Sequence, residues 1–170
     1  MVTAPLLDAR TAAEGVVDPE MPMLTLADLG VLRGVDTAGD GTVVVTITPT
    51  YSGCPALDEM RADLRRKLHA AGHERVEVRT TFSPPWSTDW ISDAGRRKLA
   101  EAGVAPPDRL GPRPAGGPVP LTLVAPSRAV ACPRCGAPDT EETSRFGPTA
   151  CTALRRCRSC AEPFEHVKEI

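Results

Sequence analysis

Aromatic side chains are scarce in this 170-residue chain, which has two Trp, one Tyr and three Phe. Net charge is also small, −2 at neutral pH, so the composition does not indicate a polyanionic partner. No apolar run approaches the ~20 residues that span a bilayer. The stretch from Met1 to Arg10 lacks the basic region and hydrophobic core of a signal peptide. We therefore expect a cytoplasmic protein that does not cross a membrane.

Common catalytic signatures are absent too. The sequence has no H-E-x-x-H motif, no Gly-rich phosphate loop and no nucleophile elbow. It also lacks the Glu-x-x-His pairs that hold di-iron centres in helical bundles. His69 and His73 have helical i, i+4 spacing, but Gly72 between them indicates a helix end and no third ligand is near in sequence. These absences argue against an enzyme, and against a di-iron oxygenase in particular.

Cysteine, by contrast, is concentrated near the C-terminus, where five of the six lie after residue 131. In a reducing cytoplasm such cysteines serve as metal ligands or reactive thiols more often than as disulfides. Cys132 and Cys135 form one C-x2-C pair, and Cys157 and Cys160 form another, 21 residues further on. Two such knuckles place four thiolates around one ion, for which zinc is the default. Two thioredoxin-like redox pairs are disfavoured because neither pair lies in a βαβ pattern.

The rest of this C-terminal stretch leaves two questions open. Cys151 is either a buried thiol under the zinc ribbon or a second metal-handling thiol. The cluster of Arg155, Arg156 and Arg158 raises the possibility of a nucleic-acid-binding ribbon. However, residues 104–170 carry nine basic and seven acidic residues, and the basic positions are not interleaved with aromatics. A solvated basic face is therefore the better interpretation, and nucleic acid is not expected as a partner.

Cys54 occupies a distinctive position in the first half of the chain. The β-branched run from Thr42 to Thr48 predicts a buried strand, and Ala56 to Ala71 predicts an amphipathic helix. Cys54 therefore lies between a strand end and a helix start, with Pro55 expected at the first helical position. The helix dipole and the unpaired N–H groups there would lower the pKa of the thiol. The alternative is a small buried apolar cysteine.

Hydrophobic periodicity and turn signals predict the secondary structure of the rest of the chain. The expected helices cover 8–17, 56–71 and 92–102, and the expected strands cover 31–36, 42–48 and 75–82. This order predicts an α+β fold, in which a small three-stranded sheet is covered on one face by helices and a four-cysteine zinc ribbon follows. Val104 to Pro120, with six prolines and three glycines, predicts a linker. The predicted domains are 1–103 and 121–170, joined by the linker at 104–120, with a strand at Leu121 to Val124.

Two further features admit more than one interpretation. Asp18 and Glu20 flank Pro19, and these carboxylates either support a metal site or form an acidic turn at a helix end. Phe82, Trp86 and Trp90 are half of the aromatic residues in the chain. They form either a docking surface or a plug on a small core, and the plug is favoured because so small a sheet needs large apolar side chains.

Several separated motifs together resemble a known family. Three stretches resemble the domain of iron–sulfur cluster assembly and carrier-type proteins, including the SufT-like group: Asp18-Pro19-Glu20, Leu26 to Gly30 and Thr48-Pro49-Thr50-Tyr51-Ser52-Gly53-Cys54-Pro55. The remaining motifs resemble the D subunits of bacterial phenylacetyl-CoA epoxidase systems, which combine that domain with a zinc ribbon. These motifs are Pro85 to Ile91, the cysteine ribbon, Phe146-Gly147 with Thr149 to Cys151, and Glu162 to Phe164.

The resemblance implies a role in aerobic phenylacetate degradation. A multicomponent di-iron oxygenase there epoxidises the ring of phenylacetyl-CoA, with electrons from a reductase that carries flavin and a [2Fe–2S] cluster. The D-type subunit would be a non-catalytic accessory factor that matures or delivers an iron–sulfur or iron centre to these partners, together with iron–sulfur assembly machinery. Cys54 would be the functional thiol and Asp18 and Glu20 the supporting acids.

The ribbon cysteines would hold a structural zinc ion, and a cluster or iron would be bound only transiently. One departure is Glu169, where relatives often have a cysteine, so a mechanism that needs a C-terminal thiol is in doubt. Two other functions stay open. One is a structural docking subunit of the oxygenase complex, and the other is a nucleic-acid-binding zinc-ribbon protein.

Overall fold

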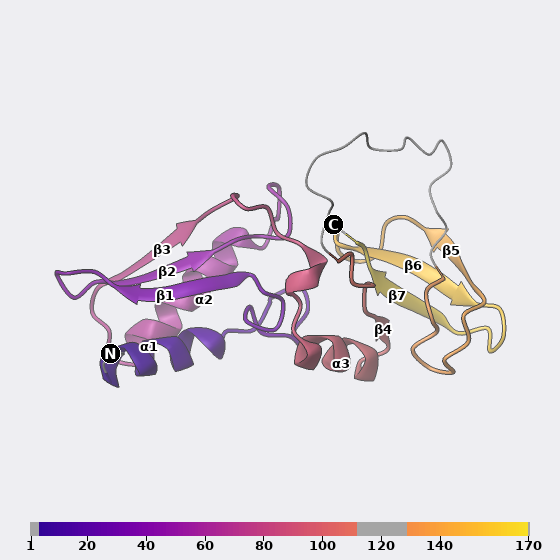
Figure 1. Cartoon of the computed structure of the whole chain (residues 1–170), viewed down its shortest axis with the longest axis horizontal. Coiled ribbons are helices and arrows are strands. Elements are labelled where there is room, and N and C mark those ends of the chain that lie inside the picture. The colour runs from indigo at the N-terminus through magenta and orange to yellow at the C-terminus, as the bar shows by residue number, and fades with distance from the viewer. Residues whose placement is uncertain (1–3, 112–128, 170) are drawn as a thin grey trace. The chain divides into compact units, whose positions relative to one another are not determined.

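The computed structural model describes residues 4–111 and 129–169, which form two compact units divided between Leu99 and Ala100 (Figure 1). The first unit holds α1 (Ala4–Glu14), β1 (Leu32–Thr37), β2 (Val43–Ile47), α2 (Leu57–Ala70), β3 (Val76–Thr80), the 3-10 turn η1 (Thr88–Trp90) and most of α3 (Asp93–Glu101). The second unit continues with β4 (Val104–Ala105), β5 (Thr140–Ser144), β6 (Thr152–Cys157) and β7 (Pro163–Val167). No described helix has both the length and the apolar composition to cross a bilayer.

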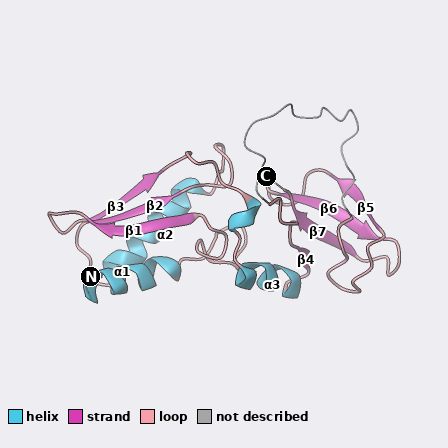
Figure 2. Ribbon diagram, viewed as in Figure 1, coloured by secondary structure: helices cyan, strands magenta, loops and turns pink. Residues whose placement is uncertain are grey.

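The first sheet has the order β1-β2-β3 and confirms the predicted α+β fold. β1 and β2 are antiparallel, and β2 and β3 are parallel, with α2 as the crossover between them. Val45 pairs with both Val35 and Val78, so these three side chains lie on the same face. Helices α1 and α2 lie on one side of the sheet (Figure 2).

The core of the first unit lies between this face and the helices. The stripe predicted for α2 is buried at Met60, Leu64 and Leu68. Ala9 and Ala13 of α1 are fully buried and small enough for close helix packing. The first helix was expected over 8–17 but ends at Glu14, since Gly15 and Val16 lead into the turn before Asp18.

A capping box between Thr25 and Asp28 forms the turn before β1. The backbone N–H of Asp28 donates to Thr25 Oγ1 and that of Thr25 donates to Asp28 Oδ2, both at 3.0 Å. Lys98 Nζ of α3 lies 2.6 Å from the same Oδ2. Although burial opposes ionisation, hydrogen bonds from Lys98 and Thr25 hold the pKa of Asp28 below its usual value. The turn is thereby fastened to α3.

Trp86 confirms the plug interpretation of the aromatic loop. Its side chain is buried, and its indole N–H donates to the carbonyl of Leu29 at 2.9 Å. Phe82 behaves differently, because 52% of it is exposed. The guanidinium of Arg33 lies 3.6 Å from the centroid of the Trp90 ring. Trp86 thus fills the core beside the capping-box turn, whereas Phe82 does not.

Gly30 closes that turn and should not tolerate a side chain. Its φ is +70°, and a Cβ there would lie 2.6 Å from the Cβ and the carbonyl oxygen of Trp90. We expect Gly30→Ala to destabilise the first unit by about 2–5 kcal/mol, the sum of left-handed strain and overpacking. Urea unfolding measures the loss. Gly72→Ala is the control, because Gly72 has φ +90° with open space around it and should cost only about 1–2 kcal/mol. Equal losses would contradict the steric argument.

The second sheet has the order β4-β7-β6-β5. β4 pairs in parallel with β7, and the other two pairs are antiparallel. Val104 and Ala105 begin the segment expected to be a linker, but they form β4, because Ala105 packs into the ribbon core. That core also contains Val130, Cys132, Cys157 and Phe164. Residues 112–120 of the expected linker and the strand expected at 121–124 lie outside the described residues.

Candidate metal centre and thiol site

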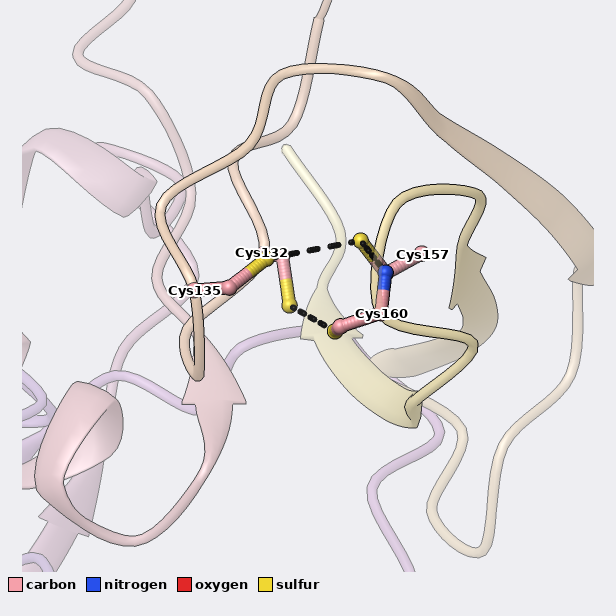
Figure 3. Close-up of side chains that lie close together, drawn as sticks. All are labelled: Cys132, Cys135, Cys157 and Cys160. Atoms are coloured by element: carbon pink, nitrogen blue, oxygen red, sulfur yellow. Dashed lines mark hydrogen bonds between the residues drawn. The ribbon is translucent and has the colours of Figure 1, made fainter.

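The two cysteine pairs come together at one end of the second sheet. Cys132 and Cys135 lie in the turn before β5, whereas Cys157 ends β6 and Cys160 lies in the turn before β7. The four sulfur atoms lie within 4.8 Å of one another. Cys132 Sγ is 3.8 Å from Cys160 Sγ, and Cys135 Sγ is 3.6 Å from Cys157 Sγ (Figure 3).

This geometry fits a four-coordinate zinc ion. A tetrahedron with Zn–S bonds of ~2.3 Å has sulfur–sulfur edges of about 3.8 Å, close to both measured distances across the knuckles. Cys132 and Cys157 are buried, whereas Cys135 and Cys160 are exposed. Four protein thiolates leave no open position for a substrate, so the site is of the structural kind.

The thiols have unequal affinities for protons before any metal binds. Backbone N–H groups, first that of Cys160 and then that of Ser159, lower the pKa of Cys157 to about 7. At Cys160 the N–H of Glu162 favours the thiolate, but partial loss of hydration and the neighbouring thiols raise its pKa to about 12. Zinc must therefore displace protons from this site, and its affinity should rise with pH.

Backbone hydrogen bonds shape both knuckles. The N–H of Gly136 donates to the carbonyl of Cys132 at 2.8 Å, and the N–H of Cys157 donates to the carbonyl of Glu162 at 2.9 Å. Arg134 Nη1 lies 2.7 Å from Glu162 Oε2, which joins the first knuckle to the segment that follows the second. Glu162, singled out in the sequence as part of a motif, therefore contributes to both knuckles.

The residue after each knuckle makes a stability prediction possible. Gly136 has φ +74°, whereas Ala161 at the corresponding position has φ +63° despite its side chain. We expect Ala161→Gly to stabilise the second unit, by up to about 1–2 kcal/mol, because it relieves left-handed strain. Gly136→Ala should destabilise the unit by a similar amount. Thermal unfolding of the zinc-loaded protein measures both changes, and shifts in the same direction would contradict this interpretation of the knuckles.

Cys151 is not part of the four-sulfur group. It is 5% exposed, and its Sγ lies 3.2 Å from Thr149 Oγ1. Its carbonyl accepts a hydrogen bond from the N–H of Lys168 at 2.9 Å. This placement agrees with the buried-thiol interpretation.

Arg155, Arg156 and Arg158 do not form a common basic face. Arg155 donates to the Thr140 hydroxyl and carbonyl, both at 3.3 Å, and is largely buried. Arg158 lies 2.9 Å from a carboxylate oxygen of Glu141. Arg156 is exposed. Since Arg155 is largely buried and Arg158 is paired with a carboxylate, this cluster gives little support to a nucleic-acid interface.

Cys54 lies in the loop between β2 and α2, as predicted, but Pro55 is not the first helical residue. Helix α2 begins at Leu57 with Ala56 as its N-cap, so Pro55 precedes the helix and does not occupy its first position. Cys54 is 8% exposed, and its backbone N–H donates to the carbonyl of Tyr51 at 3.3 Å. The turn formed by this bond delays the helix. The predicted lowering of the Cys54 pKa remains a prediction.

Asp18 is buried, whereas Glu20 is half-buried. Asp18 Oδ1 accepts hydrogen bonds from the N–H groups of Glu20 at 2.9 Å and Met21 at 2.7 Å. Burial raises the pKa of Asp18 despite these two bonds. Burial and then the charge of Asp18 raise the pKa of Glu20. The two carboxylates therefore form an interacting pair that is less acidic than usual, and Asp18 also shapes the turn.

Thr48 and His166 are buried polar residues to which the sequence assigned no role of their own. Thr48, which follows β2 and begins the loop that carries Cys54, is 1% exposed, and its Oγ1 has no partner among the described residues. His166 of β7 is 8% exposed, and burial, followed by the charge of Arg155, lowers its pKa to about 4. The alternation of Phe164 and His166 along one strand was a usable signal for His166. No local pattern distinguishes Thr48.

The two parts of the chain match two different protein families. Residues 8–79 match the family described as iron-sulfur cluster assembly protein, and residues 117–168 match the PaaD zinc beta ribbon domain. The first domain is also similar to a crystal structure of a domain of unknown function, DUF59, from Bacillus anthracis. The two are 26% identical with a TM-score of 0.52, over 56% of this chain and 92% of that one. Fold and cysteine site together therefore define an iron–sulfur assembly domain joined to a zinc ribbon.

Full-length similarity identifies the family. The chain is 41% identical over 155 residues to an Escherichia coli protein provisionally named as a 1,2-phenylacetyl-CoA epoxidase component of the D type, covering 91% of this chain and 87% of that protein. It is also 39% identical over 85 residues to an Fe-S protein maturation auxiliary factor of Porphyromonas gingivalis, covering 49% of this chain and 80% of that protein. The chain belongs to the PaaD family.

Proposed function

We propose that this protein is a non-catalytic accessory factor that helps to mature, or delivers, an iron–sulfur or iron centre for a phenylacetyl-CoA epoxidase. The observation that carries the proposal is the joining of an iron–sulfur assembly domain to a PaaD-type ribbon in one chain. The link to the epoxidase is taken from the provisional name of the Escherichia coli relative. The maturation role is taken from the name of the Porphyromonas gingivalis relative. The partners would be the reductase or oxygenase subunits and iron–sulfur assembly machinery in the cytoplasm.

In this proposal the two domains have different tasks. Cys54 is the thiol that contacts the transferred iron or cluster, which is cargo and not a resident cofactor. Its low exposure restricts access, so a partner or a cluster must enter through the loop around it. Gly53, next to it, is exposed and has no side chain of its own, which allows a close approach.

Asp18 and Glu20 support this step as proton-holding carboxylates. Thiolate coordination of iron releases protons, and a carboxylate with a raised pKa accepts a proton more readily than an ordinary carboxylate. The directions of both pKa shifts agree with this role. The zinc in the ribbon, held by Cys132, Cys135, Cys157 and Cys160, would fix the ribbon fold and take no part in transfer.

The proposal is tested in cells that lack this protein but express the epoxidase subunits. The reductase and oxygenase should be folded but poor in iron, and growth on phenylacetate should fail. Expression of the full chain should restore both the iron content and growth. Fully iron-loaded subunits in the deletion strain would contradict a maturation role and leave the structural docking subunit as the better function.

A further inference from the structure

The exposed large hydrophobic residues of the described ribbon gather on one hairpin. Phe146 is 76% exposed and Leu154 is 36% exposed, and no other large hydrophobic side chain of residues 129–169 is that exposed. Phe146 lies in the turn between β5 and β6, and Leu154 pairs with Ser144 across the same two strands. β5 is an edge strand of the second sheet, and β6 is the strand next to it (Figure 1). An aromatic side chain left this exposed is a candidate contact for another molecule.

The backbone of this turn holds Phe146 in a defined position. Ser144 Oγ accepts from the N–H of Phe146 at 3.1 Å and donates to its carbonyl at 2.9 Å. The N–H of Gly147 donates to the carbonyl of Thr152 at 3.0 Å. Gly147 is needed there, because a Cβ would collide with the Thr152 hydroxyl. Since the turn is ordered before binding, little conformational entropy would be lost on association.

Positive charge lies beside the ring. Lys168 Nζ lies 5.4 Å from the centroid of the Phe146 ring and donates to the carbonyl of Arg145 at 3.1 Å. Arg145 is itself exposed. The complementary surface is thus an apolar pocket with carboxylates at its rim.

We propose that Phe146 is the anchor through which the ribbon docks into an acidic-rimmed apolar pocket of a protein partner. The inference rests on the proposed function, which makes that partner the reductase or the oxygenase that receives the metal centre. The ribbon then supplies recognition while Cys54 in the other domain supplies the thiol. Anchors of this kind carry most of the affinity of an interface, and aromatic residues are frequent among them.

The test is the equilibrium binding of the full zinc-loaded chain to the purified reductase and to the purified oxygenase. Phe146→Ala should weaken binding to one of them by about 30-fold, the loss typical of an interface anchor. Ser144→Ala, which keeps the ring but removes both backbone bonds, should weaken it several-fold. Arg145→Ala should slow association at low salt and reduce the salt dependence. Phe82→Ala, at the exposed aromatic of the first unit, is the matched control and should have no effect.

The possible outcomes separate this proposal from the function on which it rests. If Phe146→Ala leaves the affinity unchanged, or if neither partner binds the wild-type chain, the docking role is wrong. If Phe146→Ala instead converts an oligomer of this chain to a monomer, the anchor belongs to self-association and the proposal also fails. Cys54→Ser should bind like wild type. Full iron loading by Cys54→Ser would refute the role of that thiol while leaving the docking result intact.

Discussion

Cys132→Ser is expected to lose its zinc and to unfold the second unit while the first unit remains folded. Cys132 is 2% exposed and belongs to both the four-sulfur group and the ribbon core. The described core of the ribbon is small, and zinc contributes roughly 10–16 kcal/mol of folding free energy in comparable peptides. A serine hydroxyl does not replace a thiolate ligand at neutral pH. The first unit has its own helix-covered sheet and should not depend on this metal.

Elemental analysis and circular dichroism measure these effects. The wild type should contain about one zinc ion per chain, and Cys132→Ser should contain almost none. Cys151→Ser is the matched control, because Cys151 is also a buried cysteine of the second unit but lies outside the metal group. A folded, zinc-free ribbon in Cys132→Ser, or iron in place of zinc in the wild type, would contradict the structural-zinc interpretation.

Cys54→Ser is expected to abolish iron delivery and leave the protein folded. The side chain is short, and serine differs little in volume, so the first unit should lose only about 1 kcal/mol of stability. Iron delivery to the reductase should nevertheless fall to the level of the deletion strain, because a hydroxyl is a poor ligand for iron in a cluster. Growth on phenylacetate and the iron content of the reductase measure the loss. Cys151→Ser should retain full activity as the control.

Much of the first domain could be predicted because its signals are local. The β-branched run after Gly41 and the stretch around Val78 were predicted as strands and form β2 and β3. The capping box at Thr25 and Asp28 forms as its sequence indicates. Such features depend on a few neighbouring residues, and so a single sequence is enough to find them.

Two local structures were predicted wrongly because other contacts compete with the local sequence preference. Val104 and Ala105 look like the start of a Pro/Gly-rich linker, but pairing with β7 makes them a strand. Pro55 looks like a first helical residue, but the turn closed by Tyr51 and Cys54 delays the helix to Leu57. At β4 a contact with a distant segment outweighs the local preference, whereas at Pro55 the competing contact is a turn of neighbouring residues.

The candidate sites also differ in how far the sequence alone predicts them. The zinc ligands follow from the spacing of four cysteines, which fixes their chemistry before the fold is known. The carboxylates of Asp18 and Glu20 were recognised, but the burial that raises their pKa values depends on packing. The unpartnered hydroxyl of Thr48 was missed because one threonine after a strand carries no distinguishing pattern.

The central claim is that Cys54 delivers iron or a cluster to a partner. Anaerobic cluster formation on the metal-free reductase tests this claim most directly. Wild-type and Cys54→Ser proteins, each loaded with zinc, are incubated with iron, sulfide and the metal-free reductase, and electronic spectra and iron analysis follow cluster formation. The account predicts that the wild type speeds cluster formation on the reductase and that Cys54→Ser gives only the rate seen without the protein. Equal rates with wild type and Cys54→Ser would contradict it.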